Sequence, residues 1–209
     1  MKNLFRVILT LSLFVSTAWT DDATSKTTSA DSAKAMLKDL SSDHAQAWTA
    51  AVTPGEQHKL LEQFVGNWSY TLKMWKAPGE DAEDSTGAAT IESIFGGKFI
   101  KQTATGQWAG QQFEGVGFTG FDNLQKYFNS VWIDNVSTAM MIGKGSWDEK
   151  TKSITDTGTI SCPFATNHVR DYRAVWTLPK NNTFTYEIFS KDDNGKEFKM
   201  MAITYKKVA

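Results

Sequence analysis

The sequence predicts a mainly β protein: an antiparallel up-and-down β-barrel of about ten strands, preceded by one or two short helices. From Trp68 onward, apolar and polar residues alternate with a period of two, which is typical of half-buried strands. Turn-forming residues separate these stretches at short intervals, so successive strands are expected to pair as antiparallel hairpins. No strand–helix–strand pattern follows residue 66, which excludes parallel α/β folds. Because an open sheet of ten such strands would leave two exposed edges, we expect the sheet to close or to curl strongly.

The first segment, residues 1–20, has the layout of a secretory signal peptide. Lys2 and Arg6 give it a cationic start, a short apolar stretch covers 7–15, and small residues follow at 16–18. The apolar stretch is shorter than the roughly 20 residues that span a bilayer, and the sequence has no other long apolar run. We therefore expect cleavage after Ala18 or Thr20, no membrane span, and a periplasmic or secreted mature protein. Because the one cysteine is Cys162, no lipidated cysteine can follow the cleavage site.

Residues 21–52 are expected to form a flexible leader that contains a helix. The part from 21 to 32 is rich in Ser, Thr, Asp and Ala, which is typical of disorder, whereas 33–51 contains good helix formers. A second helix is predicted from Thr53 as N-cap, with Pro54 at the first helical position and Glu56 completing a capping box. Gly66 is expected to end this helix, and 53–209 is expected to be the barrel domain.

The ten strands are predicted from the alternating stretches that follow. Glycine pairs and Asp, Asn, Pro and Lys clusters separate these stretches and supply the expected turns. The predicted strands cover about 68–74, 88–95, 98–107, 112–121, 126–134, 139–147, 153–161, 168–177, 183–190 and 197–206.

Composition excludes several classes of protein. Lys and Arg number 22 against 23 Asp and Glu, with no long basic run, so the dense cationic surface of a nucleic-acid binder is missing. A single Cys excludes an intramolecular disulfide framework and a multi-cysteine zinc site. The three His residues lack the spacing of a zinc motif, and no nucleophile elbow or P-loop is present. The unusual feature is the aromatic content, with 8 Trp and 13 Phe, which suits a barrel wall and a closed barrel end.

One predicted strand carries a row of candidate ligand-binding residues. By alternation His168, Arg170, Tyr172 and Trp176 share one face of it. If this face points inward, the row lines a cavity and holds the polar head of a ligand. If it points outward, the row is a solvated face, and Val169 and Val175 on the other side favour that alternative.

A second set combines aromatic and carboxylate residues, but each has a simpler structural explanation. Asp122 is expected to stabilise a turn, Asp134 to end a strand, and Trp132 to belong to the core. Gly115 and Gly117 lie inside a strand, where glycine marks a bulge or a barrel bend more often than a phosphate site.

The start of the first strand resembles a known barrel superfamily. A short helix leads into Gly66-Asn67-Trp68, which is similar to the G-x-W opening of the lipocalin and calycin barrels. In that superfamily the Trp closes one end of the barrel and a basic residue near the last strand packs over its ring. The resemblance assigns that part to Lys206 or Lys207, and such a cation–π contact is physically favourable.

Residues 53–206 also resemble a bacterial secreted family of unknown function with a calycin-like barrel. The resemblance implies this fold and a pocket, but no reaction. It rests on the order and spacing of the fragments Glu56-Gln57-His58, Gly66-Asn67-Trp68, Gly96-Gly97-Lys98-Phe99, Phe113-Glu114-Gly115, Gly120-Phe121-Asp122-Asn123, Trp132-Ile133-Asp134 and Ser137-Thr138.

We therefore expect an exported protein that binds a small apolar or amphipathic molecule inside the barrel, without nucleic-acid partners. The residues expected to line the site are Trp68, Tyr70, Phe118, Trp132 and Trp176, with polar contacts from His168, Arg170 or Tyr172. Three alternatives stay open. Some calycin-like barrels carry a haem on one His, and His168 is the candidate here. The barrel could instead be an enzyme that uses His168 as an acid–base group beside Asp134 or Tyr127, or a structural module filled by its own aromatic side chains.

Overall fold

The computed structural model describes residues 42–163, 165, 167–192 and 194–208. The predicted signal peptide and the predicted leader up to residue 41 lie outside the described residues. At 33–51, only the part from Ser42 onward can be compared with the structure, and it is helical as predicted.

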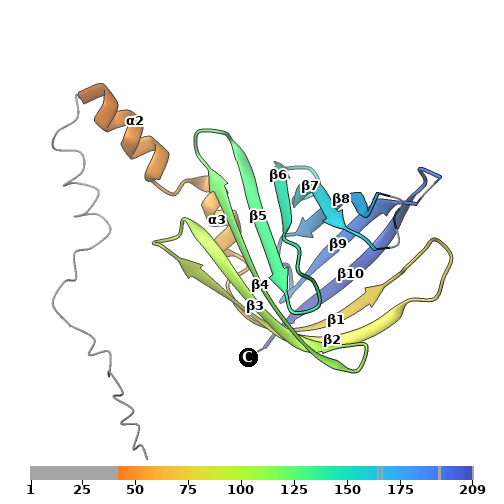
Figure 1. The fold of residues 1–209 in the computed structure, drawn as a ribbon. Coiled ribbons are helices and arrows are strands. Elements are labelled where there is room, and N and C mark those ends of the chain that lie inside the picture. The colour runs from red at the N-terminus through yellow and green to blue at the C-terminus, as the bar shows by residue number, and fades with distance from the viewer. Residues whose placement is uncertain (1–41, 164, 166, 193, 209) are drawn as a thin grey trace, which may run out of the picture.

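The ten predicted strands are present and form one closed antiparallel barrel, in which each strand pairs with its neighbours in sequence and β1 pairs with β10 (Figure 1). This confirms the predicted fold class. β2 begins earlier than predicted, at Glu83, and the other strands agree within about two residues. The strands are β1 (Gly66–Met74), β2 (Glu83–Ile94), β3 (Phe99–Trp108), β4 (Gln111–Asp122), β5 (Tyr127–Asp134), β6 (Met141–Asp148), β7 (Ser153–Ser161), β8 (Val169–Thr177), β9 (Thr183–Lys191) and β10 (Glu197–Lys207).

Two helices precede the barrel, α2 (Ser42–Val52) and α3 (Glu56–Glu62). The predicted cap at Thr53 is wrong, because its hydroxyl donates back to the Thr49 carbonyl at the end of α2. Gly55 is the N-cap of α3 instead, and its N–H donates to Nδ1 of His58 at 3.0 Å. Gly66 does not end α3 but opens β1, with a φ of 142° that favours glycine.

Aromatic side chains and α3 close one end of the barrel. Phe64 and Trp68 both meet Phe184 edge to face, with centroid distances of 5.1 and 4.7 Å, and Trp68 Nε1 donates to the Phe64 carbonyl at 2.8 Å. Lys207 Nζ lies 5.5 Å from the centre of the Trp68 ring, which confirms the basic residue expected there. Trp68 is only 1% exposed, so this half of the barrel, called the closed half below, is filled by its own side chains.

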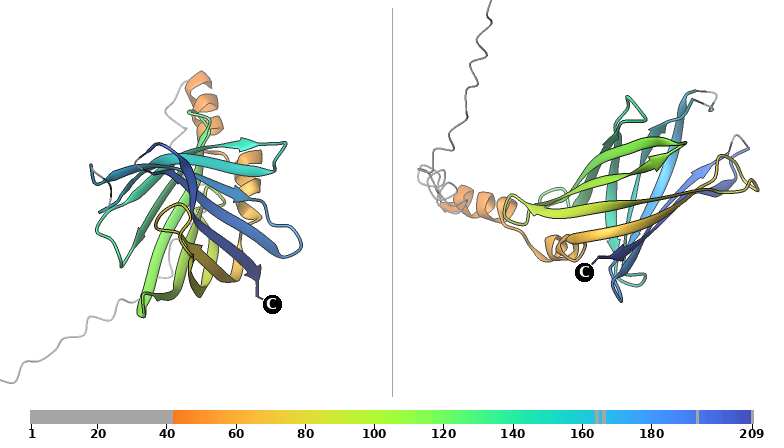
Figure 2. Two further views of the ribbon diagram at one scale, coloured as in Figure 1. Left: turned by 90° about the vertical axis from the view of Figure 1, so that its right-hand side faces the viewer. Right: turned by 90° about the horizontal axis from the view of Figure 1, so that it is seen from below.

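The helices are attached to the closed end by the turn between β4 and β5. His58 of α3 is buried and meets Phe121 edge to face at 6.0 Å. Asn123 Nδ2 donates to the carbonyls of Ala50, Ala51 and Thr53, and so caps the C-terminal end of α2. α2 itself has no buried residue and extends away from the barrel (Figure 2).

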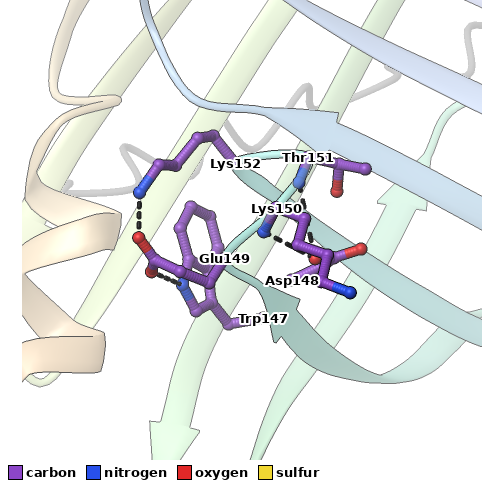
Figure 3. Close-up of polar contacts among 6 residues, drawn as sticks. All are labelled: Trp147, Asp148, Glu149, Lys150, Thr151 and Lys152. Atoms are coloured by element: carbon purple, nitrogen blue, oxygen red, sulfur yellow. Dashed lines mark hydrogen bonds and ion pairs between the residues drawn. The ribbon is translucent and has the colours of Figure 1, made fainter.

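The turn between β6 and β7 also belongs to this end (Figure 3). Trp147 Nε1 donates to Glu149 at 2.8 Å, and Glu149 also pairs with Lys152. Asp148 Oδ1 accepts from the backbone N–H groups of Lys150 and Thr151, which lowers the pKa of this exposed carboxyl. These contacts stabilise a tight turn between the two strands.

Candidate functional site

The inner wall of the barrel is shaped by aromatic rings that lie over glycines. Tyr172 on β8 pairs with Gly158 on β7, and Gly158 pairs with Gly143 on β6. A Cβ atom placed on Gly158 or Gly143 would come within 2.8 Å of a Tyr172 atom. The ring of Tyr172 therefore lies across two neighbouring strands, and its hydroxyl reaches a third strand at Ser130 of β5.

The same arrangement occurs at two other places on the wall. Tyr70 lies over Gly87 and Gly106, and Trp132 lies over Gly115 and Gly117, again at distances that leave no room for a Cβ. Gly115 and Gly117 therefore provide the space that the indole ring of Trp132 occupies. Because these rings lie against the wall, they occupy less of the barrel interior than rings that project across it.

A polar group lies at the end of the Tyr172 ring. Ser130 Oγ donates to Asp156 Oδ2 at 2.8 Å, and both atoms lie next to the Tyr172 hydroxyl around Gly143. Asp156 and Tyr172 are each only 3% exposed, yet Asp156 Oδ1 and the Tyr172 hydroxyl have no hydrogen-bond partner among the described residues. Native proteins leave few buried polar atoms without a partner, so this polar cluster of Ser130, Asp156 and Tyr172 requires an explanation.

Burial dominates the electrostatics of the polar cluster. Desolvation raises the pKa of Asp156 to about 6, and the hydrogen bond from Ser130 opposes the rise only in part. Burial, and then the charge of Asp156, raise the pKa of Tyr172 well above its usual value, and the neighbouring Ser130 side chain opposes the rise. The phenol is therefore neutral at physiological pH and can donate a hydrogen bond, while the carboxyl group titrates close to neutrality.

A small cavity separates the polar cluster from the closed end. Its volume is about 10 Å³, and its lining includes Asp156, Thr119, Leu61, Phe64 and Trp176. This is about the room that one water molecule needs. This cavity is therefore too small for a larger ligand.

On the other side of the polar cluster, the inward-facing side chains are only half buried and, apart from Arg170, mostly apolar; this region is called the open half. Trp132 stacks on Phe113 with a centroid distance of 6.5 Å, and its Nε1 donates to Asp134 at 2.9 Å. Asp134 thus holds the indole in place. The half-buried inward residues of the open half are Leu72, Phe113, Trp132, Met141, Ile160, Arg170 and Met201.

Most predicted site residues face the interior, but two do not. Arg170, Tyr172 and Trp176 share the inward face of β8, so the inward alternative holds for that strand. Tyr70 and Trp132 also face inward, Trp68 belongs to the closed end, and Trp176 lines the small cavity.

Phe118 lies on the outer wall of β4 and is 38% exposed, so its predicted place in the interior is wrong. His168 is also misplaced: β8 begins at Val169, and His168 is exposed in the preceding loop with a φ of 56°. A His in that loop is not an acid–base group inside the barrel, so the enzyme hypothesis loses its central residue. The exposed position does not support His168 as a ligand to a haem inside the barrel either.

Sequence reasoning missed Asp156 and Ser130. The signal that could have identified Asp156 is its position in β7, where it shares a face with Ile154 and Ile160 rather than with the threonines. A carboxylate on the apolar face of a strand is expected to be buried.

No helix in the described residues is long and apolar enough to cross a membrane. They also contain no group of three or more His, Cys, Asp or Glu side chains placed to hold a metal ion.

The fold and the site define a closed ten-stranded antiparallel β-barrel with one end filled and a buried polar cluster near its middle. The chain belongs to a family described as "protein of unknown function (DUF1579)", whose profile matches residues 53–207. This confirms the family resemblance seen in the sequence motifs.

Two solved structures are similar to this chain. One is the crystal structure of Rv2717c from M. tuberculosis, with a TM-score of 0.52 and 11% identity over 75% of this chain and 100% of that chain. The other is a redesigned β-barrel, with a TM-score of 0.37 and 13% identity over 72% of this chain and 96% of that chain. The first shows a shared fold and nothing further. No curated protein matches the sequence.

Proposed function

We propose that the protein binds a small amphipathic molecule in the open half of its barrel. The observation that carries this proposal is the pair of buried oxygen atoms, Asp156 Oδ1 and the Tyr172 hydroxyl, that have no partner among the described residues. A buried polar atom without a hydrogen bond costs about 1–3 kcal/mol, so a ligand that supplies the partner recovers free energy on binding.

The apolar part of the ligand has a matching surface. The inward residues of the open half leave apolar area partly in contact with water, and covering that area is favourable at roughly 25 cal/mol per Å². Met141 and Met201 pack near Tyr172, and methionine side chains adapt readily to the shape of a ligand. In this proposal, these side chains move to admit the ligand from the open half.

Arg170 lies on the same inward face as Tyr172, two residues closer to the open end. In this proposal it contacts a part of the ligand that stays close to solvent. The ligand would thus have one polar group at the cluster, an apolar body, and a solvated end.

The proposal can be tested by native mass spectrometry of the mature protein, purified from its own periplasm and then denatured to release a bound molecule. Met141→Lys places a charge in the open half, whereas Ile142→Lys places the same charge on the outer wall one residue away. We expect a released molecule from the wild type and from the Ile142 variant but not from the Met141 variant. Equal amounts from both variants would place the ligand outside the barrel.

The rival structural hypothesis, a barrel filled entirely by its own side chains, is supported by the closed half. It would prevail if no molecule is released and no apolar probe binds.

Export is also part of our proposal, and it predicts that the mature protein in the periplasm begins near residue 19 or 21. Recovery of the protein with residues 1–20 intact from the cytoplasm would contradict it.

A further inference from the structure

We propose that the polar cluster selects ligands whose buried end is a neutral hydroxyl group, as in an alcohol or a phenol, and that it rejects carboxylates, sulfonates and phosphates. This inference rests on the proposed function and names the chemical class of the ligand. It is carried by the three oxygen atoms that converge beside Gly143, and by two atoms of the cluster, the Tyr172 hydroxyl and Asp156 Oδ1, that have no hydrogen-bond partner among the described residues.

The geometry of the polar cluster brings its groups to one point. The Tyr172 hydroxyl, Ser130 Oγ and Asp156 Oδ2 lie 2.5, 2.6 and 3.1 Å from the position that a Cβ on Gly143 would occupy. The Ser130 hydrogen is already used, because Ser130 donates to Asp156. What the cluster still offers is one donor, the Tyr172 hydroxyl, and one acceptor, Asp156 Oδ1.

A hydroxyl group is the simplest ligand group that can bond to both the Tyr172 donor and the Asp156 acceptor. Its hydrogen is donated to Asp156 Oδ1, and its oxygen accepts the hydrogen of Tyr172. An anionic group has oxygen acceptors only, so it leaves Asp156 Oδ1 unsatisfied and brings a second negative charge close to a buried carboxylate. Two like charges in a site of low dielectric repel each other strongly.

Burial raises the pKa of Asp156 to about 6, so the carboxylate form predominates above neutral pH. The selection against anionic ligands is therefore expected to be strongest above neutral pH. Arg170 on the same face of β8 carries the opposite charge, and it would favour an anion if it dominated the site. If Asp156 dominates, an anion binds more weakly than a neutral ligand, and if Arg170 dominates, it binds more tightly. A comparison of the two affinities therefore separates these cases.

A matched control exists inside the same barrel. Tyr70 also lies over two inward glycines, but its hydroxyl already donates to the Thr105 carbonyl at 3.2 Å. β2 and β7, which lie under the Tyr70 and Tyr172 rings respectively, are five strands apart in the closed order, so the two tyrosines lie on opposite sides of the barrel. Removing the hydroxyl of Tyr70 therefore tests for general effects of losing a buried phenol.

The experiment uses three probes with the same flat apolar body: naphthalene, 2-naphthol and naphthalene-2-sulfonate. Binding to the full mature chain is measured by fluorescence titration at about pH 7.5, where 2-naphthol is neutral and Asp156 is largely ionised. We expect 2-naphthol to bind at least about tenfold more tightly than the sulfonate, which corresponds to one charge-assisted hydrogen bond. Naphthalene is expected to lie between them.

The variants assign this preference to the polar cluster. Tyr172→Phe is expected to weaken 2-naphthol binding about fivefold or more relative to naphthalene, whereas Tyr70→Phe is expected to leave the ratio of the two affinities as it is in the wild type. Asp156→Asn is expected to strengthen sulfonate binding. Each variant is first shown to be folded by its near-ultraviolet circular dichroism. If Asp156→Asn does not fold, the comparison of the two tyrosine variants decides.

Two results overturn this inference while the proposed function stands: equal binding of all three probes, or tighter binding of the sulfonate than of 2-naphthol. If none of the probes binds and native mass spectrometry releases no molecule, the proposed function fails, and this inference fails with it.

Discussion

Replacing Asp156 by Asn should make the protein more stable at neutral pH and should flatten part of its pH profile. Asp156 is 3% exposed and has one hydrogen bond, from Ser130. The buried carboxylate is therefore poorly compensated. Asn has nearly the same shape, cannot ionise, and keeps an oxygen acceptor for Ser130.

The size of the effect follows from the pKa shift. The pKa of Asp156 rises from 3.8 to about 6 on folding, so the native state binds the proton more tightly than the unfolded chain. The free energy of unfolding therefore falls as pH rises from about 4 to 6, and above that range it stays lower by about 3 kcal/mol. Because this cost is absent in Asp156→Asn, the variant should gain up to that amount at pH 8 and little at pH 4.

His58 acts in the opposite direction. Burial lowers its pKa below 6.5, although a hydrogen bond with the Phe121 backbone opposes the shift. The native state then binds that proton less tightly, so stability from His58 is present above pH 6.5 and is lost as pH falls. The wild-type profile contains both effects, and the difference between wild type and Asp156→Asn isolates the carboxylate.

The assay is urea unfolding at several pH values between about 4 and 8, with the free energy obtained by linear extrapolation. Asp171→Asn on the exposed face of β8 controls for the loss of one negative charge. A wild-type minus variant difference that stays constant across this range would refute the reasoning. So would a variant that is less stable than the wild type at pH 8.

Three further predictions follow from the packing. Gly143→Ala should lower the free energy of unfolding in urea by about 1–3 kcal/mol. The loss should be smaller in the Tyr172→Phe background, because the Tyr172 hydroxyl is the atom nearest the new Cβ. Equal losses in the two backgrounds would contradict this contact. Asn123→Ala should speed amide hydrogen exchange in α2 by removing its C-terminal cap, while exchange in the barrel strands stays unchanged. Trp68→Ala should cost about 3–5 kcal/mol of unfolding free energy, and a loss below about 1 kcal/mol would show that Trp68 does not hold the closed end.

The sequence predicts the strands because inward-facing apolar residues alternate with outward-facing polar residues along most of them. β4 shows where that reading fails. Its inward residues include Gly115 and Gly117, which carry no apolar mass, while Val116 and Phe118 face outward. The missing bulk comes from the Trp132 ring on the next strand, and alternation within one strand contains no information about that ring.

The start of β2 and the end of the β7–β8 loop were misplaced for related reasons. Residues 83–87 combine acidic and small side chains, which have low strand propensity, and they are strand because β1 pairs with them along its whole length. At His168 the alternation continues in the sequence, but its positive φ places the residue in the loop, one residue before β8 begins. The residue alternation within one segment determines neither the start of β2 nor the start of β8, because both depend on pairing with neighbouring strands.

The sequence motifs and the candidate site differ in what they do. His58, Asn123 and Trp68 join the helices to the barrel and close its end, and the Trp132–Asp134 pair fixes one ring against the wall. The polar cluster lies outside these motifs, on β5, β7 and β8, and its unpartnered atoms stabilise no part of the fold. Buried polar atoms without a partner are places where a bound molecule would recover free energy, and this is the basis of the proposed function. Substitutions at the motif residues should therefore change folding, whereas substitutions in the polar cluster should change stability and, if the proposed function holds, ligand binding as well.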